Sequence, residues 1–93
     1  MPADLAFLLS YLLGEELGID VKVVRVEARG GGVVCVEAQL EERHVEACTV
    51  VAACRGLEGA RLERCISKTL AQGGKQLREL AGRLREATQG SVG

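Results

Sequence analysis

Residues 20–54 decide the fold, and they read DVKVVRVEARGGGVVCVEAQLEERHVEACTVVAAC. Apolar and charged residues alternate over much of this stretch, and a period of two is typical of a β-strand with one buried face. Three consecutive glycines, Gly30–Gly32, interrupt the pattern and favour a hairpin turn. A charged segment, Glu41–His44, predicts a second turn. We therefore predict an antiparallel meander of three strands, over residues 20–29, 33–41 and 45–54.

The two turns also predict which residues of neighbouring strands lie opposite one another. Val26 is expected opposite Val36, and Val36 opposite Thr49, within a face that is small and aliphatic. Arg25 is expected opposite Glu37 on the other face, where opposite charges across two strands attract. The aliphatic face is predicted to carry Val24, Val26, Val36, Ala38, Ala47 and Thr49. The second, mixed face is predicted to carry Val23, Arg25, Cys35, Glu37, Cys48 and Val50.

Helical patterns flank the predicted sheet on both sides. Residues 2–17 are predicted to form a helix, with Pro2 in its first turn and Gly18 directly after its end. The apolar residues of this helix wrap most of its circumference, so we expect burial on more than one side. After the sheet, residues 57–88 have helical spacing, and residues 89–93 are expected to form a frayed tail.

The predicted helix over residues 57–88 is long for a small sheet, since it would reach roughly 45 Å at about 1.5 Å per residue. Gly73–Gly74 is its natural break point, because each glycine costs about 1 kcal/mol relative to alanine inside a helix. We favour one continuous helix and keep a break at Gly73–Gly74 as the alternative. The predicted fold class is two-layer α+β, with both helices on the aliphatic face of the meander and residues 1–93 as one domain.

Apolar residues form a seam along the predicted last helix, at spacings of three and four. This pattern resembles the heptads of a coiled coil, and a glycine on the seam would let another helix approach closely. The apolar surface of this seam and of the first helix together is larger than one small sheet can cover. The sequence therefore predicts a non-enzymatic protein-protein interaction or assembly module, as a homo-oligomer or a small subunit of a larger complex. The interface candidates are Ile66, Leu70, Gly73, Leu77, Leu80 and Leu84.

Charge is unevenly distributed along the chain. Residues 1–54 contain four basic and nine acidic residues, a net charge of −5, whereas residues 55–93 contain eight basic and four acidic residues, a net charge of +4. Such a split suits association of unlike halves, or an anionic partner. The alternative function is RNA or DNA binding through a basic stripe on the last helix, although a solvated helix face has the same pattern. The stripe consists of Arg61, Arg64, Lys68, Lys75, Arg78 and Arg85.

Four cysteines lack the C-x-x-C spacing of structural zinc sites. In the predicted register Cys35 and Cys48 are diagonal, so a disulfide between them would need a register shift or a bulge. Cys54 and Cys65 show no metal-ligand spacing either. We expect buried free thiols, with disulfides as the alternative, because some hyperthermophiles tolerate them in the cytosol. A single histidine, His44, completes no catalytic pattern. We therefore predict no catalytic residue, no metal, no cofactor and no small-molecule substrate.

The apolar segment at residues 5–13 is too short to span a bilayer and lacks the basic region and cleavage site of a signal peptide. We therefore expect a cytoplasmic location and no membrane partner. Asparagine is absent and glutamine occurs four times, a depletion that suggests a thermophilic source, although GC-rich coding produces the same bias. The only aromatic residues are Phe7 and Tyr11, which disfavours a base-stacking surface or a large ligand pocket.

Overall fold

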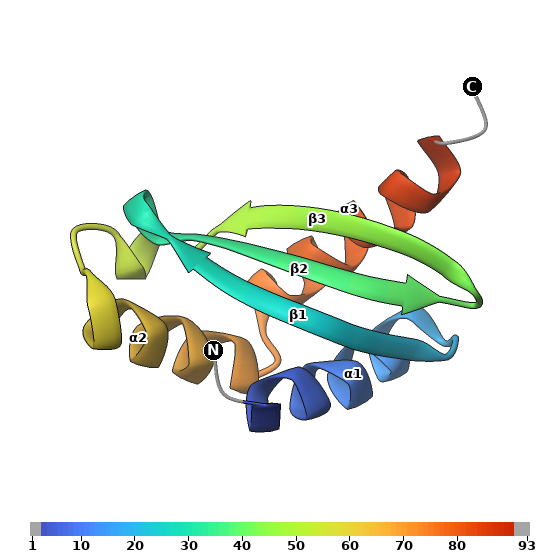
Figure 1. Ribbon diagram of the computed structural model, residues 1–93, viewed down its shortest axis with the longest axis horizontal. Coiled ribbons are helices and arrows are strands. Elements are labelled where there is room, and N and C mark those ends of the chain that lie inside the picture. Colours follow the sequence, from blue (N-terminus) through green and yellow to red (C-terminus); the bar gives the residue numbers. More distant parts are fainter. Residues whose placement is uncertain (1–2, 91–93) are drawn as a thin grey trace.

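Three helices lie on one face of a three-stranded antiparallel sheet (Figure 1). The structure is a computed structural model that describes residues 3–90. The strands are ordered β1-β2-β3, so the predicted α+β class and the meander are confirmed. The predicted strand 45–54 is displaced toward the N-terminus and appears as β3. The elements are α1 (Ala3–Leu17), β1 (Val21–Arg29), β2 (Val33–Leu40), β3 (Arg43–Val50), α2 (Gly59–Ala71) and α3 (Lys75–Gly90).

The core lies between the sheet and the helices, and it is built from aliphatic side chains. Branched residues of β2 form its central row, because β2 has a neighbouring strand on each side and the helices on one face. Leucines from all three helices pack against this row. The largest fully enclosed residues are Leu9, Leu13, Val34, Val36, Val51, Cys54, Ile66, Leu70, Leu80 and Leu84.

β1 contains a bulge at Val24. Val23 and Arg25 pair with adjacent residues of β2, so that Val24 is an extra residue without a partner there. An extra residue reverses the alternation of a strand. Val23 is therefore buried, whereas 49% of Val24 is exposed. The predicted inward Val24 and outward Val23 were wrong, while the pairing of Val26 with Val36 is confirmed.

Only two residues, Glu41 and Glu42, form the turn between β2 and β3. Both have positive φ angles, 48° and 77°, as a two-residue type I′ turn requires. The predicted turn was longer, because glutamate is not among the residues that favour this backbone conformation. The shorter turn shifts the register by two residues. Val36 consequently lies opposite Ala47, and its predicted pairing with Thr49 was wrong.

The corrected register places Cys35 directly opposite Cys48, and the two form a disulfide. A second disulfide joins Cys54, in the short 3₁₀ turn after β3, to Cys65 of α2. The expectation of free thiols was therefore wrong, since all four cysteines are bonded. One bridge connects two strands, and the other connects the end of the sheet to a helix.

Gly73 ends α2 and separates it from α3. Its φ angle is +67°, a left-handed conformation that glycine adopts readily after a helix end. Its amide donates a hydrogen bond to the carbonyl of Leu70 at 3.1 Å. The favoured single helix over residues 57–88 was therefore wrong, and the alternative, a break at Gly73–Gly74, is confirmed.

The chain ends differ slightly from the prediction. α3 continues through residues 89 and 90, the first part of the expected frayed tail. Residues 91–93 and the predicted first-turn Pro2 lie outside the described residues. Among the described helices, none has both the length and the hydropathy needed to cross a membrane.

Candidate interaction surface

The apolar seam predicted as an oligomer interface lies inside the chain's own core. Because α2 and α3 are separate helices, each turns its apolar side inward. Five seam residues are at most 3% exposed: Ile66, Leu70, Leu77, Leu80 and Leu84. The sixth, Gly73, forms the turn between the helices. A core-facing helix and a coiled coil share the same apolar spacing, so the seam is not a surface of the folded chain.

All six basic side chains of the predicted nucleic-acid stripe are exposed. None of them forms an ion pair within the described part of the chain. The break at Gly73 divides the stripe between two helices that run in different directions (Figure 1). Instead of one continuous stripe, the structure has an α2 basic group, which is Arg61, Arg64 and Lys68, and an α3 basic group, which is Lys75, Arg78 and Arg85.

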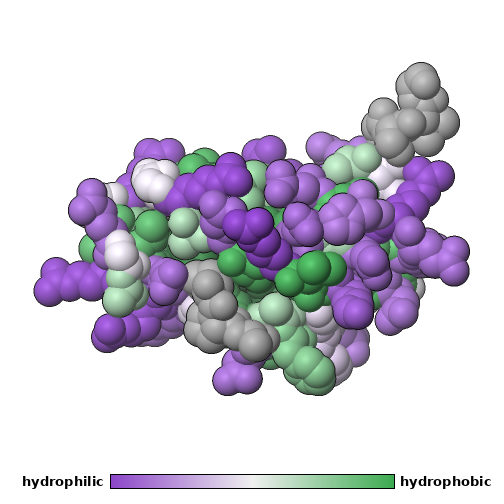
Figure 2. Space-filling model, in the orientation of Figure 1, coloured by the Kyte–Doolittle hydropathy of each residue, from purple (hydrophilic) through white to green (hydrophobic). Residues whose placement is uncertain are grey.

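The outer side of α1 leaves apolar surface uncovered. Phe7 is 82% exposed, Tyr11 63% and Leu8 38%, and we call these three residues the aromatic stripe. The opposite side of α1, with Leu9 and Leu13, is fully enclosed. Figure 2 shows apolar surface over α1 and the adjoining part of β1. Within the described chain this helix is therefore buried on one side only, and its predicted burial on more than one side stays a prediction that requires a partner.

Ser10 fixes the position of α1 beside the free edge of β1. Its hydroxyl accepts a hydrogen bond from the amide of Val23 at 2.8 Å and donates one to the carbonyl of Ala6 at 2.8 Å. Val24, the bulge residue, follows this amide directly and points outward. The bulge therefore adds an exposed apolar side chain on β1 next to the point where α1 is attached.

A shallow depression lies between the second half of α1 and the start of β1. Its lining includes Tyr11, Gly14, Glu15 and Asp20. The aromatic stripe thus ends at a hollow with one aromatic ring and two carboxylates on its walls. Such a hollow offers a partner both apolar contact and negative charge.

Sequence reasoning missed the aromatic stripe, although a signal for it exists. At about 100° per residue, the three stripe residues share one side of α1 with Asp4 and Glu15. Both acids are exposed. Charged residues at the two ends of this side mark it as the side that faces water. The leucines around the rest of the helix hid the signal, because the helix is apolar almost all round.

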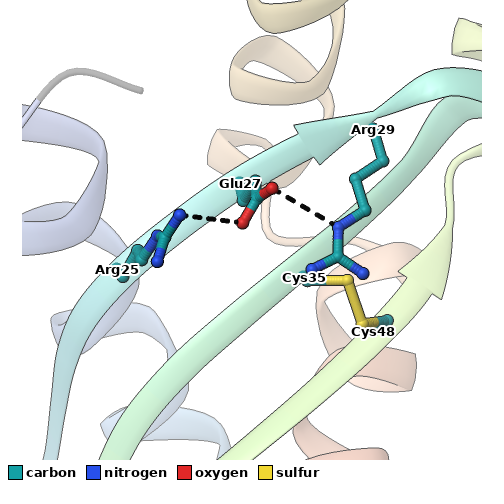
Figure 3. A network of polar contacts seen from close by, with 5 residues as sticks. All are labelled: Arg25, Glu27, Arg29, Cys35 and Cys48. Carbon is teal, nitrogen blue, oxygen red and sulfur yellow. Dashed lines mark ion pairs between the residues drawn. A yellow bond between two sulfur atoms is a disulfide. The ribbon is translucent and has the colours of Figure 1, made fainter.

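Ion pairs connect charged residues on the sheet face that no described helix covers (Figure 3). Glu27 binds Arg25 and Arg29 of its own strand, with N–O distances of 3.2 and 3.5 Å. Glu37 lies opposite Arg25, as predicted, but its carboxylate contacts Nε2 of His44, at 3.3 Å. These side chains remain between 29% and 66% exposed, so each contact contributes little to stability.

The Cys35–Cys48 disulfide lies on the same sheet face, beside Arg29 (Figure 3). Glu27 is the residue of β1 directly opposite Cys35. Cys35 is buried although no helix of the described chain covers it. The polar face of the sheet is therefore reinforced by one covalent bond between its two C-terminal strands.

The described residues include no group of three or more His, Cys, Asp or Glu side chains arranged to hold a metal ion. What they offer on the surface is an aromatic stripe, two basic groups and a charged sheet face. Comparisons with protein families, with curated proteins and with solved structures found no match to this chain.

Proposed function

We propose that this chain is a non-enzymatic association module that binds a partner protein through the aromatic stripe of α1. The observation that carries the proposal is that both aromatic residues of the chain, Phe7 and Tyr11, lie one helical turn apart and are mostly exposed. Aromatic residues are enriched at protein interfaces and supply much of the binding free energy there.

The apolar area involved is large enough to matter. A buried aromatic side chain covers roughly 200 Å², so covering Phe7 and Tyr11 removes roughly 300 Å² from water. At about 25 cal/mol per Å², this corresponds to about 7 kcal/mol before the entropic costs of association. Ser10 holds the helix against β1, so little ordering of the surface is needed on binding.

The stripe also replaces the assembly surface predicted from the sequence. Leu77 and Leu80 belong to the core, so an assembly built through them would require the fold to open. An oligomer or a complex that leaves the fold intact uses α1 instead. The partner is then either a second copy of the chain or a different protein.

Site-specific photo-crosslinking tests this proposal. A photoreactive phenylalanine analogue at position 7 is expected to give a discrete crosslinked species in cells that produce the protein. The same analogue at Val50, which is exposed on β3, is the matched control and is expected to give none. The mass of the product separates a second copy from another protein. Equal yields at both positions, or no product at position 7, would contradict the proposal.

A second candidate function is nucleic-acid binding through the two basic groups. The observation that favours it is that all six side chains are exposed and none is neutralised by an ion pair within the described chain. Phosphate contacts by such residues release counterions, so the affinity falls steeply with salt. Here the α2 group and the α3 group would contact separate parts of the backbone.

Filter binding with single- and double-stranded RNA and DNA, at several salt concentrations, tests the second candidate. Changing Arg61, Arg64 and Lys68 to Glu is expected to lower both the affinity and the salt slope. The matched variant changes the three residues of the α3 group, so the comparison shows which helix is used. Absence of binding at low salt would remove this candidate.

We propose a cytoplasmic location, in an organism whose cytoplasm keeps protein disulfides oxidised. Disulfides are rare in most cytosols but common in intracellular proteins of hyperthermophiles, and the lack of asparagine agrees with such a source. Cell fractionation with immediate thiol trapping tests this location. The protein is expected in the cytoplasmic fraction with all four cysteines protected from the trapping reagent.

A further inference from the structure

The described α1 helix carries negative charge only. Its acidic residues are Asp4, Glu15 and Glu16, and it contains no basic residue. All three are exposed, and none forms an ion pair within the described part of the chain. The aromatic stripe is therefore an apolar surface bordered by uncompensated carboxylates.

The two ends of the stripe are both acidic. Asp4 and Glu15 share the side of α1 that carries Phe7 and Tyr11, and they are about 16 Å apart at about 1.5 Å per residue. Asp20, directly before β1, adds a third carboxylate in the hollow beside Tyr11. A complementary surface has apolar side chains in its middle and cations at a separation of about three helical turns.

This charge pattern argues against a second copy of the chain. Two α1 helices packed antiparallel about a two-fold axis would place Phe7 against Tyr11 of the other copy. The same arrangement brings Asp4 of each copy close to Glu15 of the other, and like charges at an interface are repulsive. The basic groups on α2 and α3 of a second copy do not fit the aromatic stripe either. The exposed sides of these helices lack large apolar residues, so they offer cations without apolar contact.

We infer that the aromatic stripe binds a basic amphipathic helix of a different protein. This inference rests on the proposed function and adds the chemical class of the partner. The apolar side of the partner helix covers Phe7, Leu8 and Tyr11, and its Lys or Arg residues lie over Asp4 and Glu15. Helices commonly bind in this mode, through apolar anchors on one side and charge at the rim.

The test uses a fluorescent 18-residue synthetic peptide of Leu and Lys, with leucines at helical spacing, titrated with the intact oxidised chain by anisotropy. Two further peptides serve as controls. One has glutamate in place of every lysine, and the other has the same composition in scrambled order. Saturable binding is expected for the first peptide only, and it is expected to weaken as salt rises, because the rim charges are exposed.

Variants then assign the binding to the stripe. Phe7→Ser with Tyr11→Ser is expected to weaken binding of the Leu/Lys peptide by about tenfold or more, whereas the control Val50→Ser leaves it unchanged. Asp4→Asn with Glu15→Gln is expected to weaken it by about threefold to tenfold and to reduce its salt dependence. The matched charge control is Glu63→Gln with Glu86→Gln, two exposed acids on α2 and α3.

Different failures have different meanings. If the Leu/Glu peptide binds as well as the Leu/Lys peptide, and the stripe variant abolishes both, the surface is correct but the basic partner is wrong. If sedimentation shows a dimer of the chain alone that Phe7→Ser with Tyr11→Ser dissociates, the occupant is a second copy and the inference is again overturned. If no peptide responds to the stripe variant and the chain stays monomeric, the stripe is not a docking site. That last result overturns the proposed function as well.

Discussion

The outer side of α1 and the inner sides of α2 and α3 carry similar apolar residues, yet only the latter are buried. In α2 and α3, charged residues separate the leucines into a single apolar side, and that side packs into the core. α1 has more apolar residues than its buried side can hold, and the surplus includes both aromatic residues. Periodicity therefore shows that a helix has an apolar side but not what covers it.

The largest expected effect is at a buried leucine on the inner side of α3. Leu80 of α3 has no exposed surface, so Leu80→Lys would bury an unpaired charge. We expect a loss of at least about 4 kcal/mol in the free energy of unfolding, which is a large fraction of the stability of an ordinary domain. Circular dichroism during urea denaturation measures it, with Leu80→Ala expected to cost about 3 kcal/mol. A folded Leu80→Lys variant that dissociates an oligomer would show that the seam is a surface after all.

The second-largest effect is expected from the disulfide that attaches α2 to the end of the sheet. Removing the Cys54–Cys65 bridge by Cys54→Ala with Cys65→Ala should lower the free energy of unfolding by about 3 kcal/mol, because a loop of this size no longer constrains the unfolded chain. The bridge spans a sequence separation of 11 residues, and the matched Cys35–Cys48 bridge spans 13. Their removal should therefore cost similar amounts. A wild-type protein whose urea midpoint is unchanged by reductant would contradict both bridges.

Much of the fold was predictable, because period-two alternation and the Gly30–Gly32 turn define two strands without help from tertiary structure. The register between β2 and β3 was not predictable. It depends on Glu41 and Glu42 at positive φ, which no local propensity favours. That error of two residues also concealed the Cys35–Cys48 disulfide, since the bridge requires the two residues to lie directly opposite one another.

The candidate site was harder to predict than the fold. The break at Gly73 turned a seam that resembled a dimer interface into the inner sides of two core helices. The aromatic stripe was recognisable only from where Asp4 and Glu15 fall on the same side of α1. A long apolar run hides such a pattern, because the pattern depends on which leucines the sheet can cover, and that is a property of the packed structure.

A smaller effect is expected at the turn that sets the register. Glu41→Asn with Glu42→Gly introduces the pair that best fits a type I′ turn and should raise the free energy of unfolding by about 1–2 kcal/mol, because the left-handed backbone is strained for glutamate. Urea denaturation measures the gain, and Glu46→Gln on β3 is a charge control. No gain would indicate that this turn has a different conformation, and the register of β3 would then need revision.

The smallest effect is expected at Phe7 of the aromatic stripe. Phe7 and Leu9 are two residues apart on α1 but lie on opposite sides of it, one mostly exposed and one fully buried. Phe7→Ser should change the free energy of unfolding by less than about 0.5 kcal/mol, whereas Leu9→Ser should lower it by at least about 3 kcal/mol. Urea denaturation of both variants measures the difference. Equal losses would mean that Phe7 contributes to the core, and an aromatic ring that stabilises the fold of its own chain is not free to bind another.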